Sequence, residues 1–284
     1  MKEREKVQEI VHQLNIIDDT FFQKMAEDIG FCEEMISTIL EQTVTVKSVA
    51  VQNSIKNLQG RSVVLDALCI LENGAECNVE IQKSDDDNHA KRVRYNVSCI
   101  TANITEPGTK FEKVPDVIGI YISKFDMFRS GKTIYHIDRI IRETGEVQDN
   151  GLQEIYVNTK IDDGSDIAEL MRIFKEKDAY NFEKFPRVSG RKKQFKENEG
   201  GSDKMCDLVE NYAKEYAEKV AKQVAEQVTE QVTEQVTEQV TEQTEKDTAF
   251  RLFQNGVDYR AVRASITSLS DEELQKIYEK AKNG

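Results

Sequence analysis

Residues 65–83 read LDALCILENGAECNVEIQK, and this stretch decides the fold class. Apolar and polar residues alternate on both sides of Asn73-Gly74, a pattern typical of two β-strands joined by a tight turn. Asp66 and Glu80 stand inside these strands. A carboxylate in such a place is unfavourable unless water or a partner compensates its charge, so the two acids need an explanation.

The length of the turn decides whether the two acids meet. A two-residue turn at Asn73-Gly74 would point Asp66 and Glu80 to opposite faces of the sheet. A three-residue loop, with Gly74 as the left-handed residue of a bulge, would set them directly opposite each other. We predict this second register because it collects the polar residues on one face. The other face is then wholly apolar and consists of Val63, Leu65, Ala67, Cys69, Leu71, Ala75, Cys77, Val79 and Ile81.

Opposed acids on neighbouring strands suggest a metal site. Carboxylates with Cβ atoms about 5 Å apart repel each other, so a shared proton or a cation must neutralise them. Paired carboxylates suit Mg²⁺ or Mn²⁺, which also take a backbone carbonyl, here that of Ile81. Such an ion activates water against a phosphate ester, and Gln82 could orient that water but not act as a base. The alternative is a solvated sheet face, where acids need no partner.

Length and composition indicate a globular chain with one substantial core. Of the 284 residues, 38% are hydrophobic, and no apolar run approaches the roughly 18 residues of a membrane span. The N-terminus MKEREKVQEI is charged and lacks an apolar signal region. We therefore predict a cytoplasmic protein without a membrane partner. The five cysteines lack metal-ligand spacing, which favours buried reduced thiols.

The net charge of −13 is unfavourable for nucleic-acid binding, but it is distributed unevenly. Residues 197–247 carry −9, whereas residues 1–196 carry −5 and residues 248–284 carry +1. Basic clusters lie at residues 91–94 (KRVR) and 191–196 (RKKQFK). DNA therefore stays open as a partner, although either cluster could simply be a solvated face.

The order of expected elements indicates a mixed α/β fold. Apolar periodicity predicts two helices within residues 18–42, broken at Gly30. Further periodic or alternating segments follow: strands at 43–52, 61–70 and 77–83, a helix at 86–104 with an acidic cap, a strand at 114–123, strand-like pieces at 133–144 and 154–159, and a helix at 164–177.

Five segments are expected along the chain: an N-terminal helix at 1–17, the α/β domain at 18–185, a linker at 186–202, a helical repeat at 203–247 and a small helical region at 248–284. The repeat, QVAEQVTEQVTEQVTEQVTEQ, places Val at every fourth position. On a helix this stripe drifts about 40° per step, so it does not form a heptad seam. The repeat is either a helical spacer or the means of forming a homo-oligomer.

Asp66, the Glu80-Ile81-Gln82 run and the KRVRY helix together resemble the PD-(D/E)XK nuclease superfamily. The longer run VVLDALCILENGAECNVEIQ, followed by AKRVRYNVSCI, is similar to the Rpn-type recombination-promoting nucleases, often labelled PD-(D/E)XK family transposases. The resemblance covers roughly residues 16–180. It implies a restriction-endonuclease-like core, a mixed sheet flanked by helices, with a helical C-terminal extension.

The resemblance also implies roles for individual residues. Asp66 and Glu80 would be metal ligands, and Gln82 occupies the position where the superfamily usually has Lys. Arg92 and Tyr95, one turn apart on the following helix, would face the site or the phosphate backbone of DNA.

Two further positions bear on this resemblance. Asn96 stands where a second Tyr is usual. On the early helix, Glu33 or Glu34 could supply an additional acid to the metal, although a surface position on an amphipathic helix is the alternative.

The expected function is a metal-dependent DNA endonuclease of mobile-element origin that hydrolyses phosphodiesters. In the family, such activity is linked to promoting recombination. Two other classes stay open: a catalytically decayed DNA-binding module, and an oligomeric scaffold built on the Val repeat. Neither the target sequence nor the strand preference can be inferred, because no base-reading element stands out.

Overall fold

The structure is a computed structural model that describes residues 13–56, 61–85, 88–197, 240–241, 243–266 and 268–282. The chain divides into two compact units, Met1–Tyr212 and Ala213–Gly284. The first unit contains the hairpin of residues 65–83 and all the residues predicted for the site.

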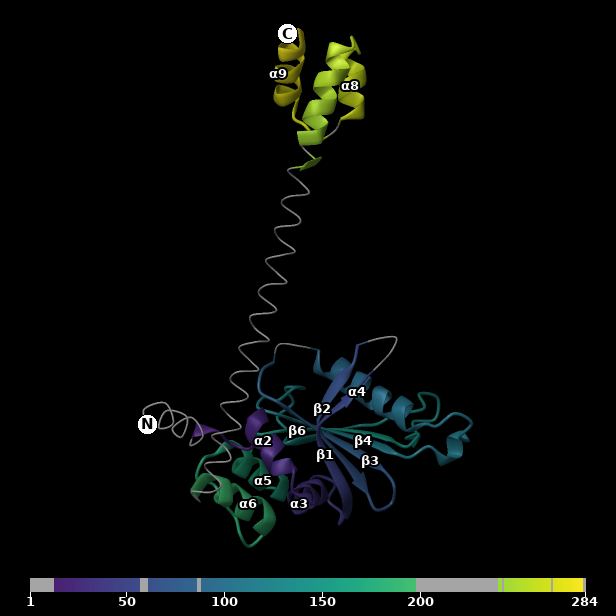
Figure 1. Cartoon of the computed structure of the whole chain (residues 1–284). Coiled ribbons are helices and arrows are strands. Elements are labelled where there is room, and N and C mark those ends of the chain that lie inside the picture. Colours follow the sequence, from purple (N-terminus) through teal and green to yellow (C-terminus); the bar gives the residue numbers. More distant parts are fainter. Residues whose placement is uncertain are drawn as a thin grey trace. The chain divides into compact units, whose positions relative to one another are not determined.

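A six-stranded mixed sheet forms the centre of the first unit (Figure 1). Its order is β1-β2-β3-β4-β6-β5, with β1, β2 and β3 antiparallel, β3, β4 and β6 parallel, and β5 antiparallel to β6. The strands are β1 Val46–Ile55, β2 Val63–Leu71, β3 Glu76–Gln82, β4 Val117–Ser123, β5 Ile134–Ile137 and β6 Leu152–Asn158. This arrangement confirms the predicted α/β class with a mixed sheet.

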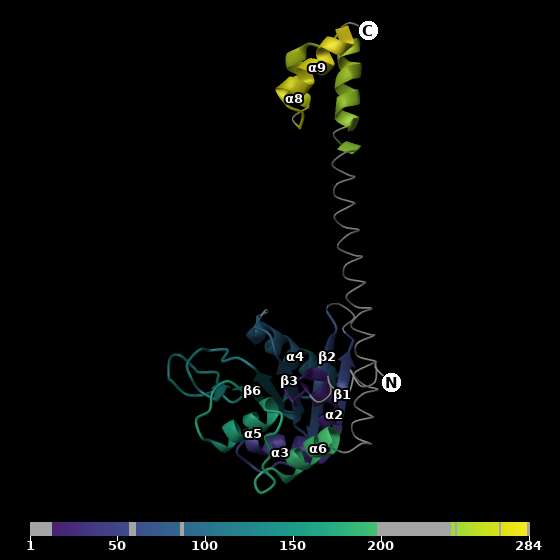
Figure 2. The same cartoon turned by 90° about the vertical axis from the view of Figure 1, so that its left-hand side faces the viewer.

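Helices cover both faces of the sheet, as Figures 1 and 2 show. One face packs in a large hydrophobic cluster with α2 (Asp19–Ala26), α3 (Ile29–Ile39), α5 (Asp166–Lys175) and α6 (Pro186–Glu197). The other face packs in a second cluster with α4 (His89–Ile104). The central strand β4 is buried along all seven residues, as expected for a parallel strand covered on both sides.

Gly119 allows α4 to lie close against β4. A Cβ atom at this position would come within 2.9 Å of Val97 Cγ1 and 3.5 Å of Val93 Cγ1, both on α4. The missing side chain therefore brings the helix down onto the sheet. This approach matters for the site because α4 also carries Arg92 and Tyr95.

The predicted linker at residues 186–202 is wrong over Pro186–Glu197, which form α6. Val188 and Phe195 of this helix are buried in the large cluster. Lys192 is fully buried, and its ammonium donates to the carbonyls of Ile173, Glu176 and Ala179 at the end of α5. The Lys, Glu and Gly content suggested a linker, but Arg191 and Lys192 have specific backbone partners in the fold.

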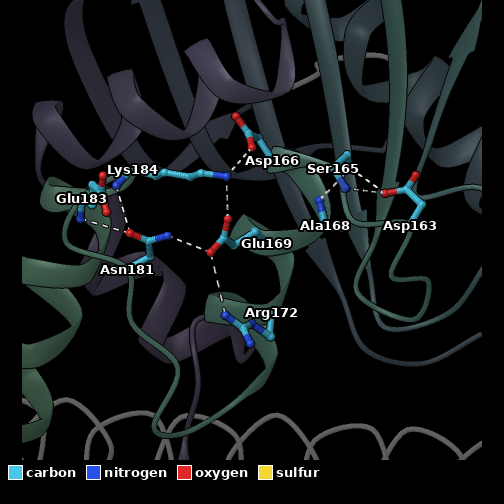
Figure 3. A network of polar contacts seen from close by, with 9 residues as sticks. All are labelled: Asp163, Ser165, Asp166, Ala168, Glu169, Arg172, Asn181, Glu183 and Lys184. Atoms are coloured by element: carbon cyan, nitrogen blue, oxygen red, sulfur yellow. Dashed lines mark hydrogen bonds and ion pairs between the residues drawn. The ribbon is translucent and has the colours of Figure 1, made fainter.

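A polar network fixes the chain between α5 and α6 (Figure 3). Lys184 lies 2.7 Å from Asp166 Oδ1 and 3.0 Å from Glu169 Oε2, and these carboxylates raise the pKa of its ammonium. Asn181 donates to Glu169 Oε1 over 2.7 Å. The N-terminus of α5 is capped by Ser165, whose hydroxyl accepts from the amide of Ala168. This network links α5 to the segment that leads into α6.

Some element boundaries differ from the sequence prediction. The first helices break at Asp28, whose side chain caps α3 by accepting from Phe31 N, and Gly30 lies inside α3. The helix predicted from residue 86 begins at His89 and is capped by Asn88. The strand predicted at 133–144 ends at Ile137, and beyond it the chain makes an isolated bridge between Ile140 and Val147.

The second unit contains the C-terminal helices α8 (Tyr259–Ser265) and α9 (Asp271–Lys282), with further helical residues at 243–254. Ser270 and Glu273 form a capping box, because Glu273 Oε2 accepts from Ser270 N and Ser270 Oγ accepts from Glu273 N. The predicted N-terminal helix at 1–17 and the repeat at 203–247 lie largely outside the described residues, and the proposed oligomer is not tested.

Among the described helices, none combines the length and apolar character required to cross a membrane.

Candidate active site

The hairpin adopts the register that the apolar pattern predicted. Ala67 faces Val79, Leu68 faces Asn78 and Cys69 faces Cys77. The loop comprises residues 72–74, and Leu71 N donates to Ala75 O across its base over 2.9 Å. Gly74 has φ of +88°, the left-handed conformation that the bulge requires. The three-residue loop is therefore confirmed.

Strand β2 changes its packing at Asp66. The last paired residues of the β2–β3 ladder are Ala67 and Val79. Beyond them, Ile81 N donates over 3.0 Å to the Asp66 side chain, at Oδ2. On the neighbouring β1, Gln52 has φ of +49° and its side chain donates weakly to Asp66 Oδ1 over 3.4 Å. The β2–β3 ladder therefore ends next to Asp66. Beyond this point the Asp66 side chain accepts a hydrogen bond from the β3 backbone.

This change corrects the prediction of one continuous apolar face. All nine predicted residues are buried. Ala67 and Cys69 belong to the large cluster, whereas Val63 and Leu65 belong to the cluster under α4. Regular alternation of apolar and polar residues along β2 predicted that its apolar side chains share one face of the sheet. The positive φ of Gln52 and the end of the β2–β3 ladder next to Asp66 break this alternation, so the apolar residues of β2 pack in two different cores.

Glu80 is buried with 2% of its surface exposed. Its Oε1 accepts from the Asn78 side chain over 3.0 Å. Its Oε2 is buried without a hydrogen-bond partner, and the closest cation is Arg92, with Nη2 3.7 Å away. A buried carboxylate oxygen that accepts no hydrogen bond is costly, so this atom calls for a further ligand, either a proton, a water or a cation.

Both acids have raised pKa values. Burial raises the pKa of Asp66 to about 6, and the Asp19 carboxylate adds to this rise. Burial and the nearby charge of Asp66 raise the pKa of Glu80 to about 8, although Asn78 and Arg92 act in the opposite direction. Both carboxyls therefore resist being charged together without additional positive charge.

Gln82 and Arg92 lie beside this pair. Arg92 Nη1 is 3.4 Å from Gln82 Oε1, and Gln82 Nε2 donates to the Ser84 carbonyl over 2.8 Å. Gln82 is partly exposed. The residue at the usual Lys position therefore interacts with the cation on α4, through a carboxamide that can hold water but carries no charge.

Tyr95 and Arg92 line the same cavity, of about 720 Å³, between α4 and the beginning of β2. The Tyr95 hydroxyl donates to the carbonyl of Arg61, just before β2. Both residues predicted to contact DNA thus belong to one hollow, and Arg92 connects that hollow to Glu80.

Glu34 is not brought to the acid pair. Its carboxylate accepts from the backbone amides of Arg187 and Val188, so it caps the first turn of α6. Glu33 accepts from Val46 N and pairs with Arg187. The prediction of an extra acid at Glu34 is corrected by these contacts: amphipathic spacing placed it on α3 but could not reveal the helix that it caps.

Two residues near the site were given no role by the sequence pattern. Asp19, at the start of α2, is close enough for its charge to raise the pKa of Asp66, and its own pKa is raised, chiefly by burial. Asn78 binds Glu80 and is buried, and its Oδ1 has no hydrogen-bond partner. Asn78 lies two residues before Glu80 on β3, so the period of a strand could have predicted that the two side chains share a face. No local pattern predicted that Asp19 lies near Asp66.

The donor set is compatible with a hard divalent cation. It offers two carboxylates, one of them with an oxygen that lacks a hydrogen bond. Ile81 lies beyond the last pair of the β2–β3 ladder and is paired with Ile122 of β4 on its other side. Mg²⁺ and Mn²⁺ accept such oxygen ligands and retain water for the remaining positions. Within the described part of the chain, no three His, Cys, Asp or Glu side chains form a metal cluster by themselves, so carbonyl and water ligands would be needed.

Comparison with protein families gave a match over most of the chain. The model of the PD-(D/E)XK nuclease family transposases matches residues 28–254, which include β1 to β6 and the acid pair. The chain belongs to this family. As a PD-(D/E)XK transposase-family nuclease, it has DNA as the implied substrate class and a divalent metal as the typical cofactor of its superfamily. Searches of curated proteins and of solved structures gave no match.

Proposed function

We propose that this PD-(D/E)XK protein is a Mg²⁺- or Mn²⁺-dependent DNA endonuclease that hydrolyses phosphodiesters. The observation that carries the proposal is the Asp66–Glu80 pair. Both carboxyls have raised pKa values, and Glu80 Oε2 is buried without a hydrogen-bond partner. Such a pair is poorly satisfied by protein groups alone and suits a divalent ion.

Asp66, Glu80 and the carbonyl of Ile81 would hold the ion. When bound, a divalent ion lowers the pKa of its water and offsets the charge that develops on phosphate. Asn78 restrains one oxygen of Glu80 by its hydrogen bond. Asp66 is restrained by the amide of Ile81. These contacts hold two like charges in one place before substrate arrives.

Gln82 and Arg92 would act on water and phosphate. The Gln82 carboxamide can position a water by hydrogen bonding but cannot remove its proton at neutral pH. Arg92 supplies the positive charge that the uncharged Gln82 does not, because its guanidinium is next to both Glu80 and Gln82. Arg92 is suited to a phosphate oxygen because a guanidinium can donate two parallel hydrogen bonds.

Hydrolysis is proposed over strand transfer. The acid pair needs only an activated water to cut a phosphodiester, and no DDE-type triad was found in the sequence. In the cytoplasm the protein would act in recombination or in the biology of mobile elements, in keeping with the family's description.

The test is cleavage of supercoiled plasmid with Mg²⁺ by the full-length chain and by Asp66→Ala and Glu80→Ala. Glu72→Ala is a matched control, because Glu72 is an exposed acid in the loop of the same hairpin. We expect nicking or linearisation by the wild type and by Glu72→Ala, with at least a hundredfold loss in the other two, a typical scale for removing metal or electrostatic support. Equal cleavage by all four proteins would refute the assignment.

A specific contact favours a second candidate, a DNA-binding module without catalysis. Arg92 already lies 3.7 Å from Glu80 and partly balances its charge. If the wild type binds DNA but neither Mg²⁺ nor Mn²⁺ supports cleavage, this second function replaces the first.

A further inference from the structure

The cavity beside the acid pair has a charge opposite to that of the whole protein. Among the residues that the structure describes, its lining includes the cations Arg61, Lys91 and Arg92 and no acid. The chain as a whole carries −13. A positive hollow on an acidic protein fits an anionic ligand, and its volume of about 720 Å³ lies in the range of small-molecule pockets, roughly 300–1,000 Å³.

The cavity also contains apolar and aromatic groups that a phosphate alone does not need. Tyr95 is half-buried, and its hydroxyl bond to the Arg61 carbonyl fixes the ring between α4 and the start of β2. Val64, 51% exposed, adds apolar surface, and the buried Asn96 adds a carboxamide. Aromatic faces stack on unstacked bases, and carboxamides can hydrogen-bond to base edges.

Arg92 is shared by the cavity and the acid pair. It lines the cavity, and its guanidinium lies 3.7 Å from Glu80 Oε2 and 3.4 Å from Gln82 Oε1. A phosphate held at Arg92 is therefore beside the proposed catalytic carboxylates. The nucleotide attached to that phosphate can enter the cavity, because Arg92 is part of the cavity's lining.

We propose that this cavity binds one unpaired nucleotide of the DNA strand that is cut, with the base against Tyr95 and the phosphates on Arg61, Lys91 and Arg92. The inference rests on the proposed nuclease function and names its substrate class: DNA with an unpaired nucleotide next to the scissile phosphate, as in a single strand, flap or frayed end. Paired bases keep their faces stacked in the duplex, so a paired base enters a hollow of this kind only at the cost of unstacking and unpairing, which an unpaired nucleotide avoids.

The experiment measures binding without cleavage. A fluorescein-labelled single-stranded oligonucleotide and the same sequence as a blunt duplex are titrated with the full-length protein in EDTA at constant salt, since salt strongly affects such affinities. Wild-type protein should prefer the single strand. Tyr95→Ala should weaken single-strand binding about tenfold, the scale of one lost base–aromatic stack, and leave duplex binding within about twofold.

Further variants separate stacking from folding and from general charge. Tyr95→Phe keeps the ring, so it should retain the preference for single strands. Val64→Glu places a negative charge at an exposed cavity position, and it should weaken single-strand binding without disturbing the core. Arg94→Ala is the control for Lys91→Ala and Arg92→Ala, because Arg94 is exposed on α4 but does not line the cavity.

The outcomes distinguish this inference from the nuclease proposal. Equal affinity of the wild type for the two DNAs, or equal loss on both DNAs with Tyr95→Ala and Val64→Glu, overturns the nucleotide pocket even if plasmid is cut. A Tyr95-dependent preference for single strands in a protein that cuts no DNA keeps the pocket and refutes hydrolysis. If Tyr95→Ala does not fold, as judged by circular dichroism, the Val64→Glu and Tyr95→Phe results decide.

Discussion

Arg92 on α4 and Glu80 on β3 form an ion pair between the helix and the sheet, with 3.7 Å between Nη2 and Oε2. This carboxylate oxygen is buried and accepts no hydrogen bond. Burial and the charge of Asp66 raise the pKa of Glu80, and Arg92 lowers it. The same cation also lines the cavity, so one side chain connects the ionisation of the acid pair with the proposed binding of an anionic substrate.

Replacing Arg92 should move the pH dependence of activity. Arg92→Gln removes a cation that lowers the pKa of both Asp66 and Glu80, so both pKa values rise. Because metal binding requires deprotonated acids, the alkaline shift should be visible as a higher midpoint in the pH–rate profile, with at least tenfold less activity at pH 7, since one pKa unit is a factor of ten. Arg94→Gln should leave the midpoint unchanged. An unshifted midpoint in Arg92→Gln would show that the ion pair does not control the acids.

Glu80→Gln should change how stability depends on pH in a chelating buffer. The folded-state pKa of Glu80 is raised from 4.5 to about 8, so the folded state binds the proton more tightly than the unfolded state. Stability is greatest below pH 4.5 as far as this group is concerned, and it falls as pH rises through about 8. Glu80→Gln removes this loss, on the order of 5 kcal/mol at alkaline pH. Melting temperatures from pH 5 to 9 should converge at the acidic end; parallel curves would contradict the assignment.

Asp66→Asn and Asp66→Ala should separate structure from charge. The Asn side chain still offers an oxygen to the amide of Ile81, whereas Ala leaves this amide without the acceptor that Asp66 provides. We expect both variants to lose activity, but only Asp66→Ala to lose stability, by about 1 kcal/mol for one hydrogen bond. Urea unfolding measures the difference. Equal destabilisation by the two variants would mean that the contact with Ile81 has no energetic role.

Substitution of Asp19 should affect activity, whereas substitution of Glu34 should affect stability. Asp19→Asn removes a charge that acts on Asp66, so it should alter the activity and metal dependence of the protein. Glu34→Gln weakens the cap on α6, at a cost of about 1 kcal/mol of stability, and should leave the turnover number within about twofold. Thermal unfolding and cleavage rates are measured for both. A catalytic defect in a stably folded Glu34→Gln would restore Glu34 as an acid of the site.

Lys192→Met should destabilise the first unit. The methionine side chain fills similar volume but cannot donate to the carbonyls of Ile173, Glu176 and Ala179, in the last turn of α5 and in the segment that follows it. Leaving buried carbonyls unsatisfied costs about 1–3 kcal/mol in the free energy of unfolding. Lys193→Met is the matched control because Lys193 is an exposed neighbour on the same helix. If both substitutions have the same small effect, α6 is not held by its buried lysine.

The hairpin register and the sheet class could be predicted because they depend on local patterns. Gly74 after Glu72-Asn73 indicated the loop length, and the loop length determined the pairing of β2 with β3. The apolar run of β4 indicated a strand covered on both faces. In both cases the structural feature depends on residues that are adjacent in the sequence.

Features that depend on distant partners could not be predicted in the same way. Glu34 caps a helix that begins at Pro186, and Asp19 reaches the site from a helix far from β2 in sequence. The charged α6 resembled a linker because its buried Lys192 finds acceptors only after the chain folds. No period in the sequence encodes such contacts.

The division of β2 at Asp66 has a consequence for how the protein matures. Val63 and Leu65 pack in the hydrophobic cluster under α4, and Ala67 and Cys69 pack in the large cluster on the other face of the sheet. We expect the two carboxylates to meet only after both cores have condensed. A half-folded chain, such as one still emerging from the ribosome, would then be unable to damage the DNA around it.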